Sequence, residues 1–377
     1  MQPGPKNSIT DVSGIKVGHA QDMKLMSGTT VILPDFAAVA AVDCRGGGPG
    51  TRETDALNPA NLVEEVHAVV LSGGSAMGLD AAGGVAAWLK TQGRGFRVAK
   101  DVSVPIVPAA ILFDLLNGGE KSAMDEHTYF EFGKKAVAEA GYECPLGNVG
   151  AGTGAKAGTL KGGIGTASLQ QNSKNSAEKG FTVGALAAVN PFGSVTLPDL
   201  PDFWAWPFER NAEYGGRGAP EFNSATSANS ATSANSAINN FNELALDFDF
   251  ESPFKDAEQS FGNADKNGND AFVNSVSTNT TLCVVATDAV LTKAQAQRVA
   301  IMAQDGFARA IRPVHTPFDG DTVFVLATGK IPLSKMPPID IARLGMMAAD
   351  CVARAIARGV YAAESLGVWP GYRNSVQ

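Results

Sequence analysis

Short apolar runs and helix-spaced apolar stripes follow one another along the chain. Continuous runs at 39–42, 68–71 and 182–189 predict buried strands, and the first two lead directly into polar and glycine-rich sequence. Between 78 and 90, small apolar residues recur at three- and four-residue steps, which predicts a helix. The first half of the chain therefore indicates strands interleaved with helix and with glycine-rich turns.

A more regular block begins after residue 281. Runs at 282–286 and 322–327 predict two further strands, and apolar stripes at 293–311 and 341–356 predict two amphipathic helices. A Pro-Pro pair stands just before the second stripe, as is common where a helix starts. Because strands and helices alternate in both halves of the chain, we predict the α/β fold class, with layers of helix and sheet rather than a helical bundle.

The middle of the chain breaks this pattern. From Asn223 to Ala237 the hexapeptide Asn-Ser-Ala-Thr-Ser-Ala is repeated, and the polar character continues through 263–270. Small polar residues bury too little apolar surface to offset the entropy that is lost on ordering. We therefore predict a flexible low-complexity insertion at 222–277.

Charge and composition exclude several classes of protein. The chain has 377 residues and a net charge of −8, and this acidic balance argues against a nucleic-acid partner. No apolar run approaches the ~18 residues that cross a bilayer, and the opening residues lack an apolar signal-peptide core. The four cysteines are scattered without Cys-x-x-Cys spacing. We expect a soluble, cytoplasmic protein with no membrane partner.

Glycine is in clear excess, at 42 residues. The segment 150–155 resembles a dinucleotide-binding fingerprint, but no strand precedes it and Ala155 occupies the third glycine position. Lys161 lacks the following Ser or Thr of a phosphate-binding loop, and the Gly-x-Ser-x-Gly elbow around Ser75 lacks its last glycine. The glycines suit tight turns, or backbone N–H groups that line an anion or oxyanion site.

The junction between Asn279 and Thr280 joins the polar stretch to an apolar strand. One interpretation is simply a loop end, since Ser, Thr and Asn clusters often precede strands. The other is a peptide bond that cleaves itself and leaves Thr280 as a new N-terminus. A free α-amine, with an ordinary pKa of ~7.7–8.0, can accept the proton of a threonine hydroxyl on the same residue. The residues alone leave both interpretations open.

A second candidate feature is the acidic pair Asp319 and Asp321. Residues two apart in an extended backbone point the same way, so both carboxylates can face one site. A solvated Asp-Gly-Asp turn and a calcium loop are the alternatives, although the other ligand positions of an EF-hand are missing. His315 lies nearby, but the four histidines show no metal-ligand spacing. We therefore expect no metal and no cofactor.

Taken together, these motifs resemble the self-processing hydrolases typified by the DmpA and BapA aminopeptidases and the nylon-oligomer hydrolases. The likeness covers nearly the whole chain outside 222–277. Several ordered motifs that agree are more specific than any one glycine loop, so the resemblance favours self-cleavage at Thr280. The segments that carry it are 9–19, 71–78, 150–154, 161–165, 189–193, 279–281 and 315–324.

The resemblance implies a four-layer αββα sandwich like that of N-terminal nucleophile hydrolases. It also implies one catalytic domain over 1–377, processed into an α chain 1–279 and a β chain 280–377 that stay together, commonly as a homotetramer. Thr280 would be the nucleophile and its new amine the base. Asn190 would help to hold the oxyanion, Lys161 matches a catalytic-site lysine, and the acidic pair matches Asp319 and Asp321.

Two departures from the family pattern bear on the substrate. The aminopeptidases generally use a serine nucleophile and an acidic residue where Ala109 or Ala110 falls here, so the chain is closer to the threonine-using nylon-oligomer hydrolases. That group has a tyrosine where Phe113 falls, which implies a more apolar substrate pocket here. A small peptide or amide is expected, with 6-aminohexanoate oligomers among the candidates. The rival functions are an acyltransferase of the ornithine acetyltransferase type and an unprocessed binding protein.

Overall fold

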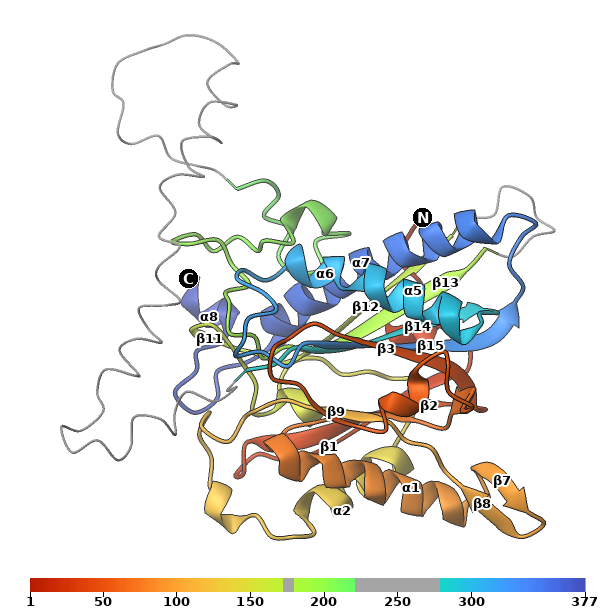
Figure 1. The fold of residues 1–377 in the computed structure, drawn as a ribbon. Coiled ribbons are helices and arrows are strands. Elements are labelled where there is room, and N and C mark those ends of the chain that lie inside the picture. Colours follow the sequence, from red (N-terminus) through yellow and green to blue (C-terminus); the bar gives the residue numbers. More distant parts are fainter. Residues whose placement is uncertain (172–179, 221–278, 377) are drawn as a thin grey trace, which may run out of the picture.

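The computed structural model describes residues 1–171, 180–220 and 279–376. The predicted insertion at 222–277 lies outside the described residues, so its expected flexibility stays a prediction. Two mixed sheets stack face to face, and helices cover the outer side of each (Figure 1). The order of layers is therefore helix, sheet, sheet, helix, which confirms the predicted α/β class and sandwich.

The first sheet has six strands in the order β12-β13-β14-β15-β3-β5. All neighbours in it are antiparallel except β14 and β15, which run parallel. A parallel pair needs a long crossover, and here α5 and α6 supply it. The strands are β12 (Ile164–Gln170), β13 (Thr182–Ala188), β14 (Leu282–Ala289), β15 (Thr322–Ile331), β3 (Ala38–Cys44) and β5 (Glu65–Val66).

The second sheet has five strands in the order β1-β2-β6-β9-β4. Its parallel pair is β6 and β9, and α1 lies between these two strands in the sequence. Two separate hairpins pair β7 with β8 and β10 with β11. The strands are β1 (Ile15–Asp22), β2 (Ser27–Pro34), β6 (Val69–Ser72), β9 (Ala109–Ile111), β4 (Gly50–Arg52), β7 (Phe96–Ala99), β8 (Val102–Val104), β10 (Lys156–Ala157) and β11 (Leu160–Lys161).

Helices α1 and α2 cover the five-stranded sheet, and α5, α6 and α7 cover the six-stranded one (Figure 1). Short 3₁₀ turns connect several of these elements. The helices are α1 (Ala81–Thr91), α2 (Thr128–Ala138), α5 (Lys293–Ala303), α6 (Asp305–Ala308), α7 (Pro337–Ala362) and α8 (Tyr372–Ser375). The 3₁₀ turns are η1 (Ile9–Asp11), η2 (Asp55–Leu57), η3 (Ser75–Asp80), η4 (Lys121–Ala123), η5 (Gly150–Gly152) and η6 (Trp206–Phe208). No helix in the described part of the chain is long and apolar enough to cross a membrane.

The apolar core between the sheets explains the runs seen in the sequence. Every residue of β14 is buried, because this strand has a sheet on one face and α5 and α7 near the other. Side chains of both sheets meet in one cluster that includes Ile15, Ile32, Leu71, Val284 and Phe324. The predicted strands at 39–42, 68–71, 182–189, 282–286 and 322–327 are confirmed, with ends that differ by a few residues.

One predicted helix differs from the structure. The stripe at 293–311 is divided at Gln304 into α5 and α6. The Gln304 side chain is buried and donates to the main-chain oxygen of Asp43 over 2.8 Å. Gly306 then approaches α7 so closely that an added Cβ would lie 2.4 Å from the oxygen of Ala349. The apolar stripe continues across the break, so hydrophobic spacing alone does not reveal it.

Candidate active site

The candidate site lies at one edge of the six-stranded sheet, where three strand ends meet. β13 runs antiparallel to β14 and therefore ends where β14 begins, while β15 runs parallel to β14 and begins at the same edge. Asn190 after β13, Thr280 before β14 and Gly320 before β15 are thereby brought side by side. The amide of Thr280 donates to the main-chain oxygen of Asn190 over 2.7 Å, and the Thr280 side chain is buried.

The hydroxyl of Thr280 faces the peptide bond that precedes it. It donates to the carbonyl oxygen of Asn279 and accepts a 3.0 Å hydrogen bond from the amide of Gly320. That same amide lies 3.2 Å from the Asn279 oxygen. One backbone N–H therefore points at both the hydroxyl and the carbonyl of the Asn279–Thr280 junction, which is the geometry of an oxyanion donor.

The two aspartates flank Gly320 and hold the backbone around Thr280. Asp321 accepts from the amide of Thr281 over 2.7 Å, and from the amide and Nδ1 of His315 over 3.1 and 2.9 Å. Asp319 accepts from the amide of Phe192 over 2.9 Å and from the side chain of Thr316 over 2.5 Å. Both carboxylates are buried, each beside the other. Burial and the neighbouring Asp321 charge raise the pKa of Asp319 to about 6.

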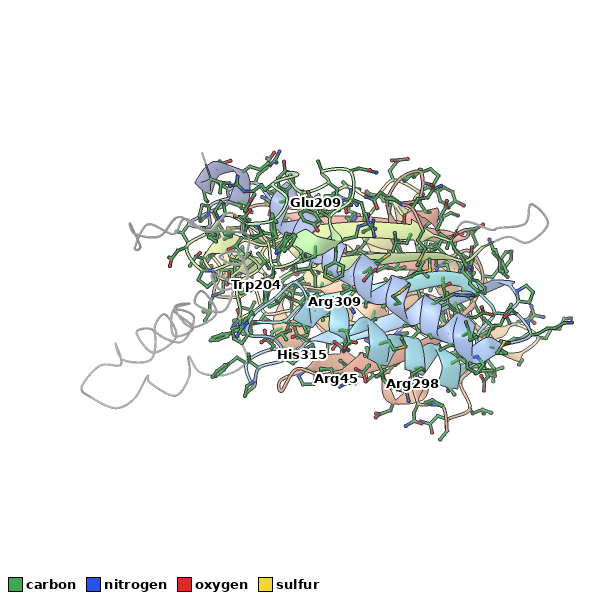
Figure 2. The ribbon with its side chains drawn as sticks, turned by 90° about the horizontal axis from the view of Figure 1, so that it is seen from above. Arg45, Trp204, Glu209, Arg298, Arg309 and His315 are labelled. Carbon is green, nitrogen blue, oxygen red and sulfur yellow. The ribbon has the colours of Figure 1, made fainter. Side chains whose placement is uncertain are left out.

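Two of the histidines have defined hydrogen-bond partners near the site or in the core. His315 is partly exposed and bonds to Asp321, whose main-chain oxygen also accepts a hydrogen bond from the amide of Arg45 over 2.9 Å. His315 and Arg45 are labelled in Figure 2. His19 bonds to the hydroxyl of Thr30, and burial lowers the pKa of His19 to about 4. Among the described residues, no group of His, Cys, Asp and Glu is arranged to hold a metal ion.

Asn190 is fully buried, and its amide has defined partners at both ends. Its Oδ1 accepts from the amide of Lys156 over 2.9 Å and from the Asn117 side chain over 3.2 Å. Its Nδ2 donates to the main-chain oxygen of Phe113 over 3.1 Å, which leaves one more N–H on that nitrogen. Phe113, predicted to line the substrate pocket, therefore touches the site through its carbonyl.

Lys161 is fully buried, and its ammonium is bound by backbone carbonyls. Its ammonium donates to the main-chain oxygens of Gly152, Ala155 and Gly162 over 2.9, 2.7 and 2.7 Å, which occupies all three of its hydrogens. Burial lowers the pKa of Lys161 to about 7. The Ala155–Lys156 peptide accepts from Lys161 at its oxygen and donates to Asn190 at its nitrogen, so it connects the two side chains.

Comparison with known proteins identifies the family of this chain. The model of the family described as Peptidase family S58 matches residues 7–373. An uncharacterized aminopeptidase of Mycobacterium tuberculosis is 42% identical over 98% of this chain and 97% of its own. The chain belongs to peptidase family S58. The resemblance inferred from the motifs is thus confirmed, and this S58 protein is a hydrolase.

Two further matches place this S58 hydrolase more broadly. A 6-aminohexanoate-oligomer endohydrolase of Kocuria sp. is 24% identical over 90% of this chain and 79% of its own. The solved L-aminopeptidase D-Ala-esterase/amidase of Ochrobactrum anthropi, described as a variant of the Ntn hydrolase fold, superposes with a TM-score of 0.64. That match has 20% sequence identity and covers 97% of this chain and 88% of the other. The predicted relation to the Ntn hydrolase fold is confirmed.

The sequence analysis did not identify one buried acid next to the site. Asp114 is fully buried and accepts from the hydroxyl of Ser27 over 2.7 Å and from the amide of Gly74 over 2.9 Å. Burial raises the pKa of Asp114, and the Lys121 ammonium 3.7 Å away opposes that rise. Its position inside the apolar run 106–116 was the available signal, because a carboxyl in such a run must find partners.

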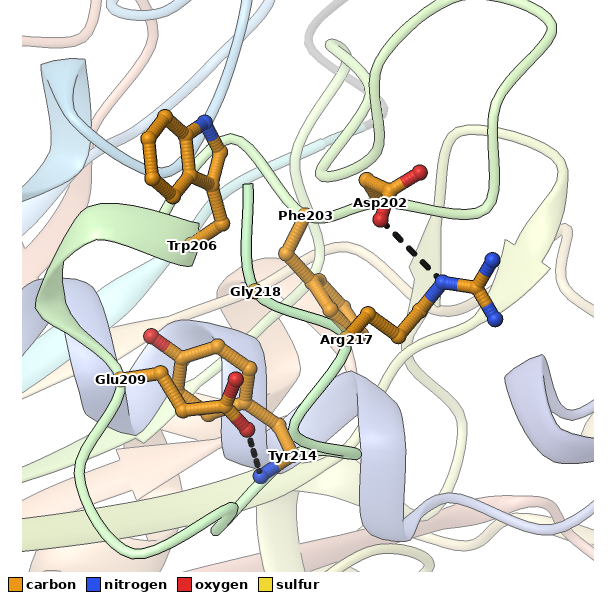
Figure 3. Close-up of a pocket in the computed structure, with 7 residues that line it drawn as sticks. All are labelled: Asp202, Phe203, Trp206, Glu209, Tyr214, Arg217 and Gly218. Carbon is orange, nitrogen blue, oxygen red and sulfur yellow. Dashed lines mark hydrogen bonds and ion pairs between the residues drawn. The ribbon is translucent and has the colours of Figure 1, made fainter. Parts of the chain in front are cut away.

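A separate small pocket lies in the loop that follows β13 (Figure 3). An ion pair between Arg217 and Asp202, 3.1 Å long, spans part of it. It contains none of the predicted site residues, so it is not part of the Thr280 site. Its lining consists of Asp202, Phe203, Trp206, Glu209, Tyr214, Arg217 and Gly218.

Proposed function

We propose that this protein is a self-activating amide hydrolase that uses Thr280 as an N-terminal nucleophile. The observation that carries the proposal is the Thr280 hydroxyl lying against the carbonyl of Asn279, with the Gly320 amide directed at both. A threonine at an ordinary loop end has no need of this arrangement. The proposal therefore favours self-cleavage over the loop-end interpretation of the junction.

In the self-cleavage step, Oγ1 of Thr280 attacks the carbonyl carbon of Asn279. The carbonyl oxygen gains negative charge, and the Gly320 N–H donates to it. The C–N bond then breaks, the Thr280 nitrogen takes up the hydroxyl proton, and an ester links Asn279 to the Thr280 side chain. Water hydrolyses this ester and releases the Asn279 carboxylate. The main-chain oxygen of Asn190, already bonded to the Thr280 nitrogen, remains positioned to hold the new amine.

Hydrolysis of a substrate reuses the same atoms. The free amine of Thr280, with an ordinary pKa of ~7.7–8.0, removes the proton of its own hydroxyl. The hydroxyl attacks the substrate amide, and the remaining N–H of Asn190 donates to the oxyanion, a contribution of typically ~3 kcal/mol for one donor. The amine of Thr280 then protonates the leaving group, and water releases the acyl group. Asp319, Asp321 and Lys161 act by holding the surrounding backbone.

The proposed substrate is a small peptide or amide. The relatives carry the names aminopeptidase and 6-aminohexanoate-oligomer endohydrolase, and both activities break an amide bond. A phenylalanine at position 113 and alanines at 109 and 110 supply no charged group for the substrate amine. We propose further that chains 1–279 and 280–377 remain associated in one catalytic domain, in a cytoplasmic homotetramer.

Intact-mass measurement of the purified protein tests the proposal. Wild-type protein should appear as two chains that meet between Asn279 and Thr280, and Thr280→Ala should remain one chain. Thr281→Val is the matched control, because the buried hydroxyl of Thr281 has no hydrogen-bond partner among the described residues. That variant should still cleave. Active wild-type protein that consists of a single uncut chain would refute the mechanism.

A further inference from the structure

The orientation of the Asn190 amide depends on a residue that none of the recognised motifs contains. Asn117 is buried 73 positions away in sequence, and its Nδ2 donates to Oδ1 of Asn190 over 3.2 Å and to the main-chain oxygen of Gly154 over 2.9 Å. The amide of Lys156 also donates to the Asn190 Oδ1. Two donors at one end of the Asn190 amide oblige that end to be the oxygen, so the NH₂ group must point the other way.

Asn117 is in turn held from the far end of the chain. The indole N–H of Trp369 donates to the main-chain oxygen of Asn117 over 3.0 Å, across 252 positions in sequence. Trp369 closes a tight turn in which its own N–H and C=O both pair with Leu366. The Lys156 ammonium lies 5.0 Å from the centre of the indole ring, within the range of a cation–π contact.

The same turn also contacts Lys161. The main-chain oxygen of Pro370 accepts the amide of Lys161 over 2.8 Å. The turn at 366–370 therefore contacts two separate segments, one with Asn117 and the other the β10–β11 hairpin with Lys156 and Lys161. Both segments come before Thr280 in the sequence, whereas the turn comes after it. The turn therefore connects the part of the chain after the Asn279–Thr280 junction with the part before it.

We propose that Asn117 and Trp369 are positioning residues for the oxyanion donor of Asn190. Trp369 fixes Asn117, and Asn117 with the Lys156 amide fixes the direction of the Asn190 amide. The inference rests on the proposed function in one respect, namely that Asn190 donates to the oxyanion. Without the Asn117 donor, Oδ1 of Asn190 keeps only the bond from the Lys156 amide, so the Asn190 side chain can shift. The N–H that faces the oxyanion would then be misplaced, and catalysis would fall.

Kinetics of the processed enzyme with alanine p-nitroanilide as the probe tests the proposal. Trp369→Phe keeps an aromatic ring and removes the indole N–H together with part of the bicyclic ring, a loss of size that the Trp88→Phe control shares. Asn117→Leu keeps the size of the side chain and removes its donors. Each should lower kcat about tenfold to a hundredfold with KM unchanged, because misplacement acts on the transition state. Trp88→Phe, in α1 and equally half-buried, is the control and should retain wild-type kcat.

A double variant separates positioning from simple damage. In the Asn190→Ala background, adding Trp369→Phe should cause no further loss of kcat, because the group that it positions is already gone. Independent losses that multiply would overturn the proposal. If Asn190→Ala has wild-type kcat, the oxyanion role within the proposed function fails. If Asn190→Ala is impaired but Asn117→Leu and Trp369→Phe are not, only the positioning role fails.

A readout that needs no turnover completes the test. In protein labelled with ¹⁵N-asparagine, the side-chain signals of Asn190 are assigned by their loss in Asn190→Ala. Trp369→Phe should shift or broaden these signals, while Trp88→Phe should leave them in place. Unchanged Asn190 signals in Trp369→Phe would overturn the proposal whether or not the enzyme hydrolyses the probe.

Discussion

Replacing Gly320 by alanine should strongly slow self-cleavage. A Cβ at this position would lie 2.7 Å from Oγ1 of Thr280 and 2.9 Å from the main-chain oxygen of Gly48. The backbone at Gly320 is not left-handed, so an alanine there causes no φ strain. Its effect comes from the steric clash of the added Cβ. The atom that it meets is the proposed nucleophile itself.

The size of the effect follows from the clash. To restore an ordinary 3.4 Å contact, the hydroxyl must move by roughly 0.7 Å away from Gly320. That shift also lengthens the 3.0 Å hydrogen bond from the Gly320 amide. A misplacement of about 1 Å costs on the order of a hundredfold in rate, and loss of one oxyanion donor costs about as much. Self-cleavage should therefore slow by about a hundredfold or more.

A time course of cell-free synthesis, resolved by denaturing electrophoresis, measures the rate at which the two chains appear. Gly83→Ala, at a half-buried position of α1, is the matched control, because its Cβ would lie 3.5 Å from the Phe130 ring, an ordinary contact. That variant should cleave at the wild-type rate. Thermal melting by circular dichroism shows whether each variant is folded. A folded Gly320→Ala protein that cleaves as fast as wild type would refute the assignment of Thr280 and Gly320.

Three further predictions concern stability. The pKa of Asp319 is raised from 3.8 to about 6, so between these pH values the folded state binds more protons than the unfolded state. The contribution of Asp319 to the free energy of unfolding should therefore decrease as pH rises from 4 to 6. Urea unfolding of wild type and Asp319→Asn across this window should show the difference, and parallel curves would contradict it. Arg354→Met removes the buried partner 2.5 Å from Glu213 and should cost about 3–5 kcal/mol by urea unfolding, with part regained on adding Glu213→Gln; no cost would mean that the pair is dispensable. Gly18→Ala places a Cβ 1.9 Å from a main-chain oxygen of α2 and should lower stability by about 2 kcal/mol or more, whereas Gly141→Ala, with 4.0 Å of clearance, should not; equal melting temperatures would show that α2 can shift.

Much of the fold was readable from hydrophobic spacing where strands and helices are wholly buried or clearly two-sided. β14 has eight buried residues and α7 a regular apolar stripe, and both were predicted. β1, β2 and α2 were not predicted, because glycine and polar residues interrupt their patterns. Gly18 in β1 illustrates the cause: it looks like a turn residue, yet it is needed where the strand lies against α2. Spacing reports which face is apolar but not how closely two backbones approach.

The candidate site divides in a similar way. The sequence by itself determined where the candidate junction lies and which residues stand near it, since Asn279, Thr280 and the acidic pair occur in short contiguous motifs whose resemblance is visible without a structure. Only the tertiary structure decided what each side chain touches. Asp319 bonds to the amide of Phe192 and Asp321 to the amide of Thr281, while Lys161 donates its hydrogens to three carbonyls.

The sequence did not reveal the role proposed for Asn117 and Trp369, because their contacts depend on the tertiary structure. Their bonds join residues 73 and 252 positions apart, and nothing in local composition encodes a partner at such a distance. Sheet order brings these segments together, because β13, β14 and β15 share one edge and the C-terminal turn packs beside it. The motifs show which side-chain types the chain has for the proposed reaction, whereas the direction in which the Asn190 amide donates depends on the folded structure.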